Sequence, residues 1–361
     1  MPRQMTPPRA FQPDHTSPPG ETVADLLDQT GMTQTELAQR LGVSLKHVNQ
    51  VVKGAASISA ELALGLEKVF GVSASFWLNR ESLYRADLAR REEDRELTTA
   101  LEWTKGFPVR ELRERGFIAS GSRGTDLVRD LLRFFGIASP EVWADPAVAF
   151  RKSQRVESDT KALATWLRAG EIEAATIDVE PFDSARFYDA LHQVRALTRL
   201  DPSEWQPALV RTCAAAGVAV VILEAFRGAR ANGATRWLSP TKALVQMSLR
   251  YRWEDVFWFS FFHEAAHVLL HRKKQIFLEG LEAVRDDESQ VWEDEADRFA
   301  ARILIPPEHE SDLRWLTLTD VPEFADRLGI DAGIVIGRLQ HDGLIPNHRG
   351  NELRHRLEIN D

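Results

Sequence analysis

Cysteine is almost absent from this sequence, since Cys213 is the only one among 361 residues. A single thiol cannot form an intramolecular disulfide and cannot provide the thiolate ligands of a structural zinc site. Any bound metal must therefore be held by histidine and carboxylate side chains. The lack of disulfide partners also fits a reducing compartment.

Long apolar runs are also missing, so no segment has the length of a membrane-spanning helix. The first 20 residues are rich in proline and polar side chains and contain no apolar core of the kind found in a signal peptide. We therefore expect a cytoplasmic protein without a membrane partner.

The sequence also lacks an excess of positive charge, because its formal net charge is −9. Coating the backbone of nucleic acid requires clustered lysine and arginine, so this charge argues against a nonspecific nucleic-acid binder. A small surface that reads DNA remains compatible with this charge.

The length of 361 residues favours two or three domains.

Hydrophobic periodicity predicts an α+β chain that is mostly α. Helical patterns dominate up to about residue 199, and apolar β-like runs follow at Val218 to Leu223 and Ala243 to Leu249. We expect a disordered tail at 1–20, an all-α helix-turn-helix domain at 21–91, a helical middle region at 92–199, a zincin-like peptidase domain with a small mixed sheet at 200–310, and a C-terminal helical segment at 311–361.

Two short helices separated by a glycine turn are predicted near the N-terminus. Thr33 and Glu36 have the spacing of a capping box at the start of the first helix, and Gly42 ends it. Ser44 caps the second helix, whose apolar residues would pack inward while Lys46 and its polar neighbours face outward. This is the layout of a recognition helix, although an ordinary helical hairpin has the same spacing.

The stretch from Thr33 to Gly54, together with Ile58-Ser59 and Ser75 to Leu78, resembles the Xre-type and HigA-like antitoxin helix-turn-helix family over about sixty residues. The resemblance implies double-stranded operator DNA as a partner and a homodimer as the form that reads two half-sites. From Glu21 to Tyr84 acidic residues slightly outnumber lysine and arginine, so affinity would depend on dimerisation. The predicted DNA contacts are Gln34, Ser44, Lys46, His47 and Gln50.

His263-Glu264-Ala265-Ala266-His267 places two imidazoles one helical turn apart, where they can share a metal, with Glu264 beside them. The flanking residues are apolar, which predicts a buried helix. Two buried histidines beside a glutamate would cost several kcal/mol without a partner, and a zinc ion would satisfy all three. His271 lies about 12 Å of helix rise from His263, too far to share one metal, and is expected at the helix end.

The third ligand is predicted on a second helix, from about Glu293 to Leu304. Glu293 and Asp297 lie at the edge of its apolar face, whereas Glu295 points away and is interpreted as a solvated charge. We predict Glu293 as the third zinc ligand, and Asp297 as the hydrogen-bond acceptor that holds a ligand imidazole in one tautomer.

The segments Phe262 to His271 and Glu293 to Pro306 resemble the ImmA/IrrE-type metallopeptidases, and the resemblance covers roughly the last 150 residues. It implies a small mixed sheet packed on the active-site helix, and a peptidase that cuts or inactivates a DNA-bound repressor. Zinc bound by His263, His267 and Glu293 would leave one position to water, and Glu264 would accept the proton of that water as general base.

The preferred hypothesis is a DNA-binding regulator whose zinc endopeptidase cleaves itself or a partner repressor or antitoxin. The alternative is a HigA-like antitoxin or repressor whose zinc domain senses metal, binds a toxin or stabilises the fold without proteolysis. A third interpretation, an enzyme whose N-terminal hairpin binds only protein, would be excluded by DNA retention that Gln50→Ala abolishes.

Two further segments carry weaker predictions. Glu323 to Ile330 echoes Glu36 to Val43, but the block after it offers few polar side chains, so packing beside the peptidase is favoured over DNA reading. Ala243 to Leu249 could pair an extended peptide by strand addition, although an internal strand is the commoner outcome.

Overall fold

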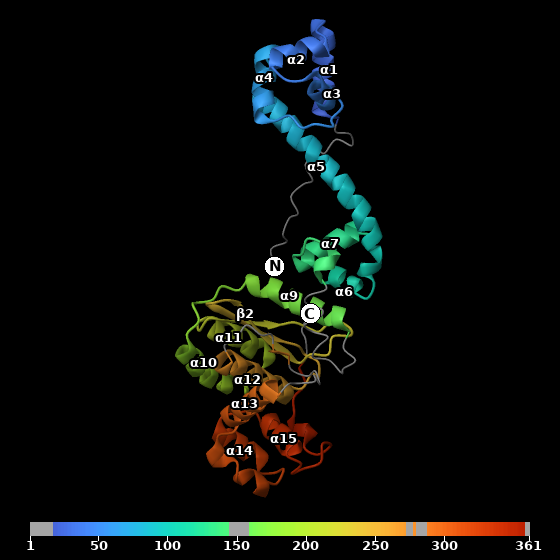
Figure 1. Ribbon diagram of the computed structural model, residues 1–361. Helices are drawn as coiled ribbons and strands as arrows, with labels where there is room; N and C mark the ends of the chain where they lie inside the picture. The colour runs from blue at the N-terminus through green and yellow to red at the C-terminus, as the bar shows by residue number, and fades with distance from the viewer. Residues whose placement is uncertain (1–16, 144–158, 272–276, 279–286, 358–361) are drawn as a thin grey trace. The chain divides into compact units, whose positions relative to one another are not determined.

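The computed structural model describes residues 17–143, 159–271, 277–278 and 287–357, which belong to two compact units (Figure 1). The first unit is Met1–Leu101 and the second is Glu102–Asp361. The predicted tail lies mostly outside the described residues, and the first helix begins at Pro19. Residue 91, where the helix-turn-helix domain was expected to end, lies inside a helix that continues to Thr99.

The first unit is entirely helical within its described residues. Its core contains Leu37, Val48, Leu66 and Trp77, all nearly inaccessible to solvent. Serine or threonine caps four of its helices, as expected for side chains that accept hydrogen bonds from free backbone N–H groups. The helices are α1 (Pro19–Thr30), α2 (Gln34–Leu41), α3 (Leu45–Val52), α4 (Ala60–Phe70) and α5 (Ala74–Thr99).

The second unit contains helices on both sides of one small sheet. Its helices are α6 (Val109–Glu114), α7 (Thr125–Phe135), α9 (Thr160–Ala175), α10 (Ser184–Leu197), α11 (Pro202–Ala214), α12 (Glu254–Leu270), α13 (Asp287–Leu304), α14 (Val321–Leu328) and α15 (Ala332–His341). Short 3-10 turns lie at Ala100–Thr104, Pro140–Trp143, Pro307–His309, Asp312–Trp315 and Asn351–Leu353. The strands are β1 (Val218–Ile222), β2 (Gly233–Ser239), β3 (Lys242–Met247) and β4 (Phe277–Leu278). The expected α+β class, mostly α with a mixed sheet, is confirmed.

The sheet has the order β1-β3-β2-β4. Strand β3 pairs parallel with β1 and antiparallel with β2, and β2 also pairs antiparallel with β4. Strand β3 is therefore hydrogen-bonded on both sides. The idea that Ala243 to Leu249 offers an edge to a peptide is wrong, because β1 and β2 already occupy its backbone groups.

Alternating side chains of β1 pack into two layers. Helix α9 covers one face of the sheet, and α10, α11 and α12 cover the other (Figure 1). Val218 and Val220 lie in the core that α10, α11 and α12 share, whereas Ala219 and Val221 pack with Ala174 of α9. Gln246 on β3 points to the α9 side and donates from Nε2 to the carbonyl oxygen of Trp166 at 2.7 Å. The sheet thus lies between α9 and the helix that carries the histidine pair.

Helix α15 packs against α12, and α14 packs against α15. Gly329 ends α14 in the left-handed conformation, φ 69°, just as Gly42 ends α2 with φ 67°. The two helical hairpins therefore share their turn geometry. Helix α15, however, buries Val335, Ile336 and Leu339 against the core, which leaves no recognition face and agrees with the packing role favoured by the sequence.

Candidate metal centre

Helix α12 is held in the middle of the second unit by aromatic side chains. Trp258, Phe261 and Phe262 are fully buried, and Thr235 of β2 donates a hydrogen bond of 3.0 Å to the carbonyl oxygen of Glu264. A helix with apolar residues on every side is expected to be buried completely. The sheet and the surrounding helices thus fix the position of the histidine pair.

The structure brings His263, His267 and Glu293 together. The two Nε2 atoms lie 3.1 Å apart, and the carboxylate of Glu293 lies 3.3 Å from Nε2 of His263 and 3.7 Å from Nε2 of His267. All three residues are buried, and one ligand atom from each lies within 4.8 Å of the others. Two imidazoles and one carboxylate are the donor set of catalytic zinc sites, so these residues fit a zinc ion.

Asp297 lies on the other side of the His263 ring. Its Oδ1 is 2.8 Å from Nδ1 of His263. A carboxylate there accepts the Nδ1 proton, which leaves the lone pair of Nε2 directed at Glu293 and His267. Glu293 and Asp297, one turn apart on α13, thus lie next to the two ring nitrogens of His263.

A second chain of contacts extends from His267, and the sequence did not predict it. Nδ1 of His267 lies 3.0 Å from Nδ1 of His271, and Nε2 of His271 lies 3.0 Å from Oε2 of Glu295. The interpretation of Glu295 as a solvated charge is therefore incomplete. His271 follows the last residue of α12 with φ −119° and ψ 59°, so the helical period could not indicate where its ring would point.

Glu264 is fully buried, and its side chain lies against Gly233 at the start of β2. A Cβ atom at Gly233 would lie 2.6 Å from Cγ and 2.8 Å from Oε1 of Glu264. Only glycine leaves room for the carboxylate in this place. No signal in the sequence linked Gly233 to the site, because the contact joins residues from a strand and a helix that are distant in the chain.

The predicted DNA-contacting residues lie on and near α3 in the first unit. Val48 and Val51 are buried, while Ser44, Lys46 and Gln50 are exposed and Gln34 and His47 are half-buried. The hydroxyl of Ser44 accepts a hydrogen bond of 3.2 Å from the backbone N–H of His47. The predicted capping box is present, because Thr33 and Glu36 each accept from the other's backbone N–H.

Comparison with known proteins identifies a class for each of these two parts. Residues 23–77 match the helix-turn-helix family, and residues 254–340 match the peptidase family described as the IrrE N-terminal-like domain. The chain therefore combines a DNA-binding helix-turn-helix domain with a domain of the metallopeptidase type.

Individual relatives match the N-terminal part. Virulence-associated protein I of Dichelobacter nodosus is 35% identical over 79 residues, which span 22% of this chain and 71% of that protein, so the chain belongs to the helix-turn-helix family. An addiction module antidote protein of the HigA family from Coxiella burnetii is 31% identical, covering 23% of this chain and 91% of that one, with a TM-score of 0.22. The antitoxin HigA of Pseudomonas aeruginosa, solved with the higBA promoter, is 31% identical, covering 23% and 90%, with the same TM-score.

Among the described residues, no helix has both the length and the apolar character needed to cross a membrane.

Proposed function

We propose that this protein is a DNA-binding regulator whose zinc-dependent endopeptidase cleaves itself or a partner repressor or antitoxin. The observation that carries the proposal is the buried cluster of His263, His267 and Glu293, in a domain that belongs to a peptidase family. Its presence in the same chain as a helix-turn-helix domain supports a regulatory substrate.

The proposed chemistry assigns one task to each side chain. A zinc ion held by His263, His267 and Glu293 supplies Lewis acidity that makes water a nucleophile near neutral pH. Glu264 accepts the proton of the attacking water and transfers it to the departing amine. Asp297 and His271 hold the two imidazoles in the tautomers that present Nε2 lone pairs to the metal.

The proposed DNA-binding surface is formed by Lys46, His47 and Gln50 on α3, by Ser44, which caps that helix, and by Gln34 at the start of α2. Side chains near the N-terminus of a recognition helix reach base edges in the major groove, while Lys46 supplies charge for phosphate. Because acidic residues slightly outnumber lysine and arginine from Glu21 to Tyr84, we propose that a homodimer provides the second half of the contacts. The cytoplasm is the proposed location.

The test compares the protein termini in cells that express the wild type with those in cells that express Glu264→Gln. Glutamine keeps the shape of the side chain but cannot accept a proton, and residue 264 is outside the proposed ligand set, so zinc binding should persist. We expect new N-termini, in this protein or in a repressor, with the wild type alone. If zinc-loaded wild type and Glu264→Gln gave the same set of termini, the endopeptidase proposal would be wrong.

A trans assay separates the two substrate classes. Tagged Glu264→Gln is mixed with untagged wild type, so that cleavage of the tagged copy reports action on a second copy of this chain. Cleavage would identify the protein as its own substrate. An intact tagged copy, together with fragments of another repressor in cells, would identify the partner as the substrate.

A further inference from the structure

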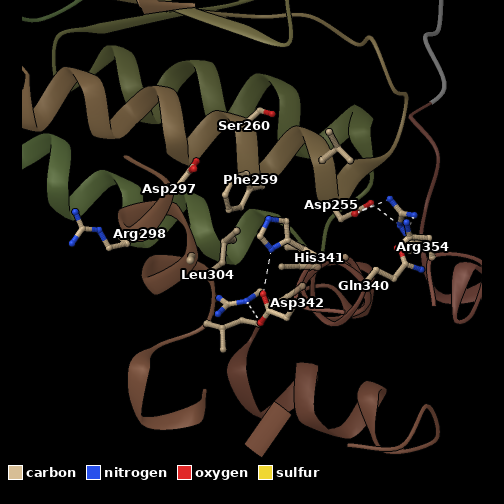
Figure 2. Close-up of a pocket in the computed structure, with 17 residues that line it drawn as sticks. Asp255, Phe259, Ser260, Asp297, Arg298, Leu304, Gln340, His341, Asp342 and Arg354 are labelled. Carbon is tan, nitrogen blue, oxygen red and sulfur yellow. Dashed lines mark hydrogen bonds and ion pairs between the residues drawn. The ribbon is translucent and has the colours of Figure 1, made fainter. Parts of the chain in front are cut away.

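A cavity of about 600 Å³ lies between α12, α13 and α15, beside the metal centre (Figure 2). Val256, Phe259 and Ser260 of α12 form one wall, one to two turns before His263. Asp297 also lines the cavity, so a single carboxylate borders both this space and the His263 ring. Neither Glu264 nor any of the three proposed zinc ligands lines it. The cavity therefore adjoins the metal centre without being part of it.

The walls of the cavity are mainly apolar. Phe259, Leu304 and Ile334 come from three different helices and would surround an apolar ligand body. Helix α15 approaches α12 closely at Gly337, where a Cβ atom would lie 2.4 Å from Oδ2 of Asp255. A cavity of this size, with apolar walls and a few polar groups, has the features of a small-molecule site.

Two of the carboxylates around the cavity are already neutralised. Asp255 accepts from Nε and Nη2 of Arg354 at 3.0 and 2.8 Å, and Asp342 accepts from Nε of Arg338 at 2.7 Å (Figure 2). These pairs leave little demand for a cationic ligand.

A guanidinium group that borders the cavity has an N–H without an acceptor, and this favours an anionic ligand. Arg338 is paired with Asp342 through Nε and lies 3.8 Å from Glu310 through Nη2, but its Nη1 is buried and has no hydrogen-bond partner among the described residues. A buried N–H donor without an acceptor costs free energy, and a carboxylate is the acceptor that suits guanidinium geometry best.

We propose that this cavity binds a small apolar carboxylic acid, with its carboxylate on Arg338 and its apolar body against Phe259, Leu304 and Ile334. The same chemistry can come from a free acid or from the C-terminal residue of a peptide. The proposal concerns binding alone, so it stands or falls independently of peptidase activity.

The probes are octanoate and the dipeptide acetyl-Leu-Leu with a free C-terminus, titrated calorimetrically into the full-length protein. Each has an uncharged counterpart of matched size, namely octanamide and the amidated dipeptide. We expect at least one of the two acids to bind, and to bind about tenfold or more tightly than its amide, since a hydrogen bond to a charged group is stronger than one between neutral groups. Octanoate binding would identify free acids as the source, and dipeptide binding alone would identify peptide termini.

Three variants locate the site. Arg338→Gln should weaken binding of the acid about tenfold or more while leaving the amide unchanged. Ala301→Phe fills the cavity from α13 and should abolish binding without removing any charge. Arg302→Gln changes an exposed residue of the same helix that does not line the cavity, and should bind like the wild type. Absence of binding by both acids, equal affinity for acid and amide, or unaltered binding to Ala301→Phe would overturn the proposal.

Discussion

Each imidazole of the proposed metal centre has both ring nitrogens engaged. His263 contacts Asp297 through Nδ1, and His267 contacts His271 through Nδ1, so that both Nε2 atoms face Glu293. For His267 to present a lone pair at Nε2, its Nδ1–H must donate to Nδ1 of His271. His271 then carries its proton on Nε2 and donates it to Glu295. The position of each proton follows from the requirement that Nε2 of both ligand histidines presents a lone pair to the metal.

This chain of contacts predicts that His271 supports metal binding without being a ligand. We expect His271→Ala to raise the zinc dissociation constant about 10- to 100-fold, the usual cost of removing a group that orients a ligand. Competition with a fluorescent chelator measures the constant. His341→Ala, which changes a highly exposed imidazole of the same unit, is the control and should match the wild type. A His271→Ala protein with wild-type zinc affinity would show that the contact is only structural.

The close approach of Gly233 to Glu264 predicts a separation of activity from metal binding. Gly233→Ala should displace the Glu264 carboxylate, because the added Cβ lies well inside contact distance, and should lower kcat by about 100-fold or more, as expected when a general base loses its position. Zinc content should stay at one per chain. Gly121→Ala, where a Cβ would meet nothing within 4 Å, is the matched control. Loss of zinc in Gly233→Ala would contradict the assigned role.

At this scale the sequence was informative wherever helical periodicity applied. The pairing of His263 with His267 and the choice of Glu293 and Asp297 over Glu295 came from that periodicity. The structure brings the two histidines and Glu293 together and places Asp297 against the His263 ring. Gly233 and His271 escaped prediction for physical reasons. One acts through a tertiary contact between a strand and a helix, and the other lies just beyond the regular part of α12.

The start of α12 buries an ionisable side chain. Glu254 is buried in its first turn, and burial raises the pKa of its carboxyl to about 7, with further contributions from the negative charges of Asp331, Asp201 and Asp255. A carboxyl whose pKa is raised by folding binds its proton more tightly in the folded state. It therefore favours folding at low pH and opposes it at high pH.

Glu254 predicts a pH-dependent loss of stability between its ordinary pKa of 4.5 and about 7. Over that window the unfolded chain releases the proton while the folded chain keeps it, so the free energy of unfolding falls as pH rises. Glu254→Gln should remove the decline and be more stable than the wild type at pH 8, by at most a few kcal/mol, since one pKa unit is worth about 1.4 kcal/mol. Near pH 5 the two should be almost equal.

Urea unfolding followed by tryptophan fluorescence measures this difference at each pH. Glu308→Gln, which changes an exposed residue of the same unit, should show no such trend. A stability difference between the wild type and Glu254→Gln that is constant from pH 5 to 8 would contradict the assignment of the decline to Glu254.

The elements themselves were largely predictable. The run Val218 to Leu223 became β1, the stretch near Ala243 became β3, and the helix expected from about Glu293 extends back to Asp287. The sequence could not show that β3 lies between two partners, because the pairing of strands depends on contacts made after the chain has folded. The echo at Glu323 illustrates the same limit, since one local sequence pattern forms a DNA-reading type of hairpin in one unit and a packing element in the other.

At the scale of the whole molecule, the chain joins a helix-turn-helix unit to a peptidase-type unit. If α3 reads DNA, Gln50→Ala should reduce retention on genomic fragments selected by the wild type about 10- to 100-fold, the value of one good contact to a base edge. Gln39→Ala, on the exposed face of α2, should retain wild-type affinity. Unchanged retention of Gln50→Ala on these fragments would show that Gln50 does not contact DNA.

Elemental analysis of purified full-length protein tests the zinc centre most directly. We expect one zinc per chain in the wild type, and its loss in Glu293→Ala, because two imidazoles alone do not complete the site. Glu295→Ala, two residues away on the same helix, should keep zinc, although more weakly bound. A wild type that contains no zinc after growth with the metal, or a Glu293→Ala protein that retains it fully, would show that these three residues do not form a zinc site.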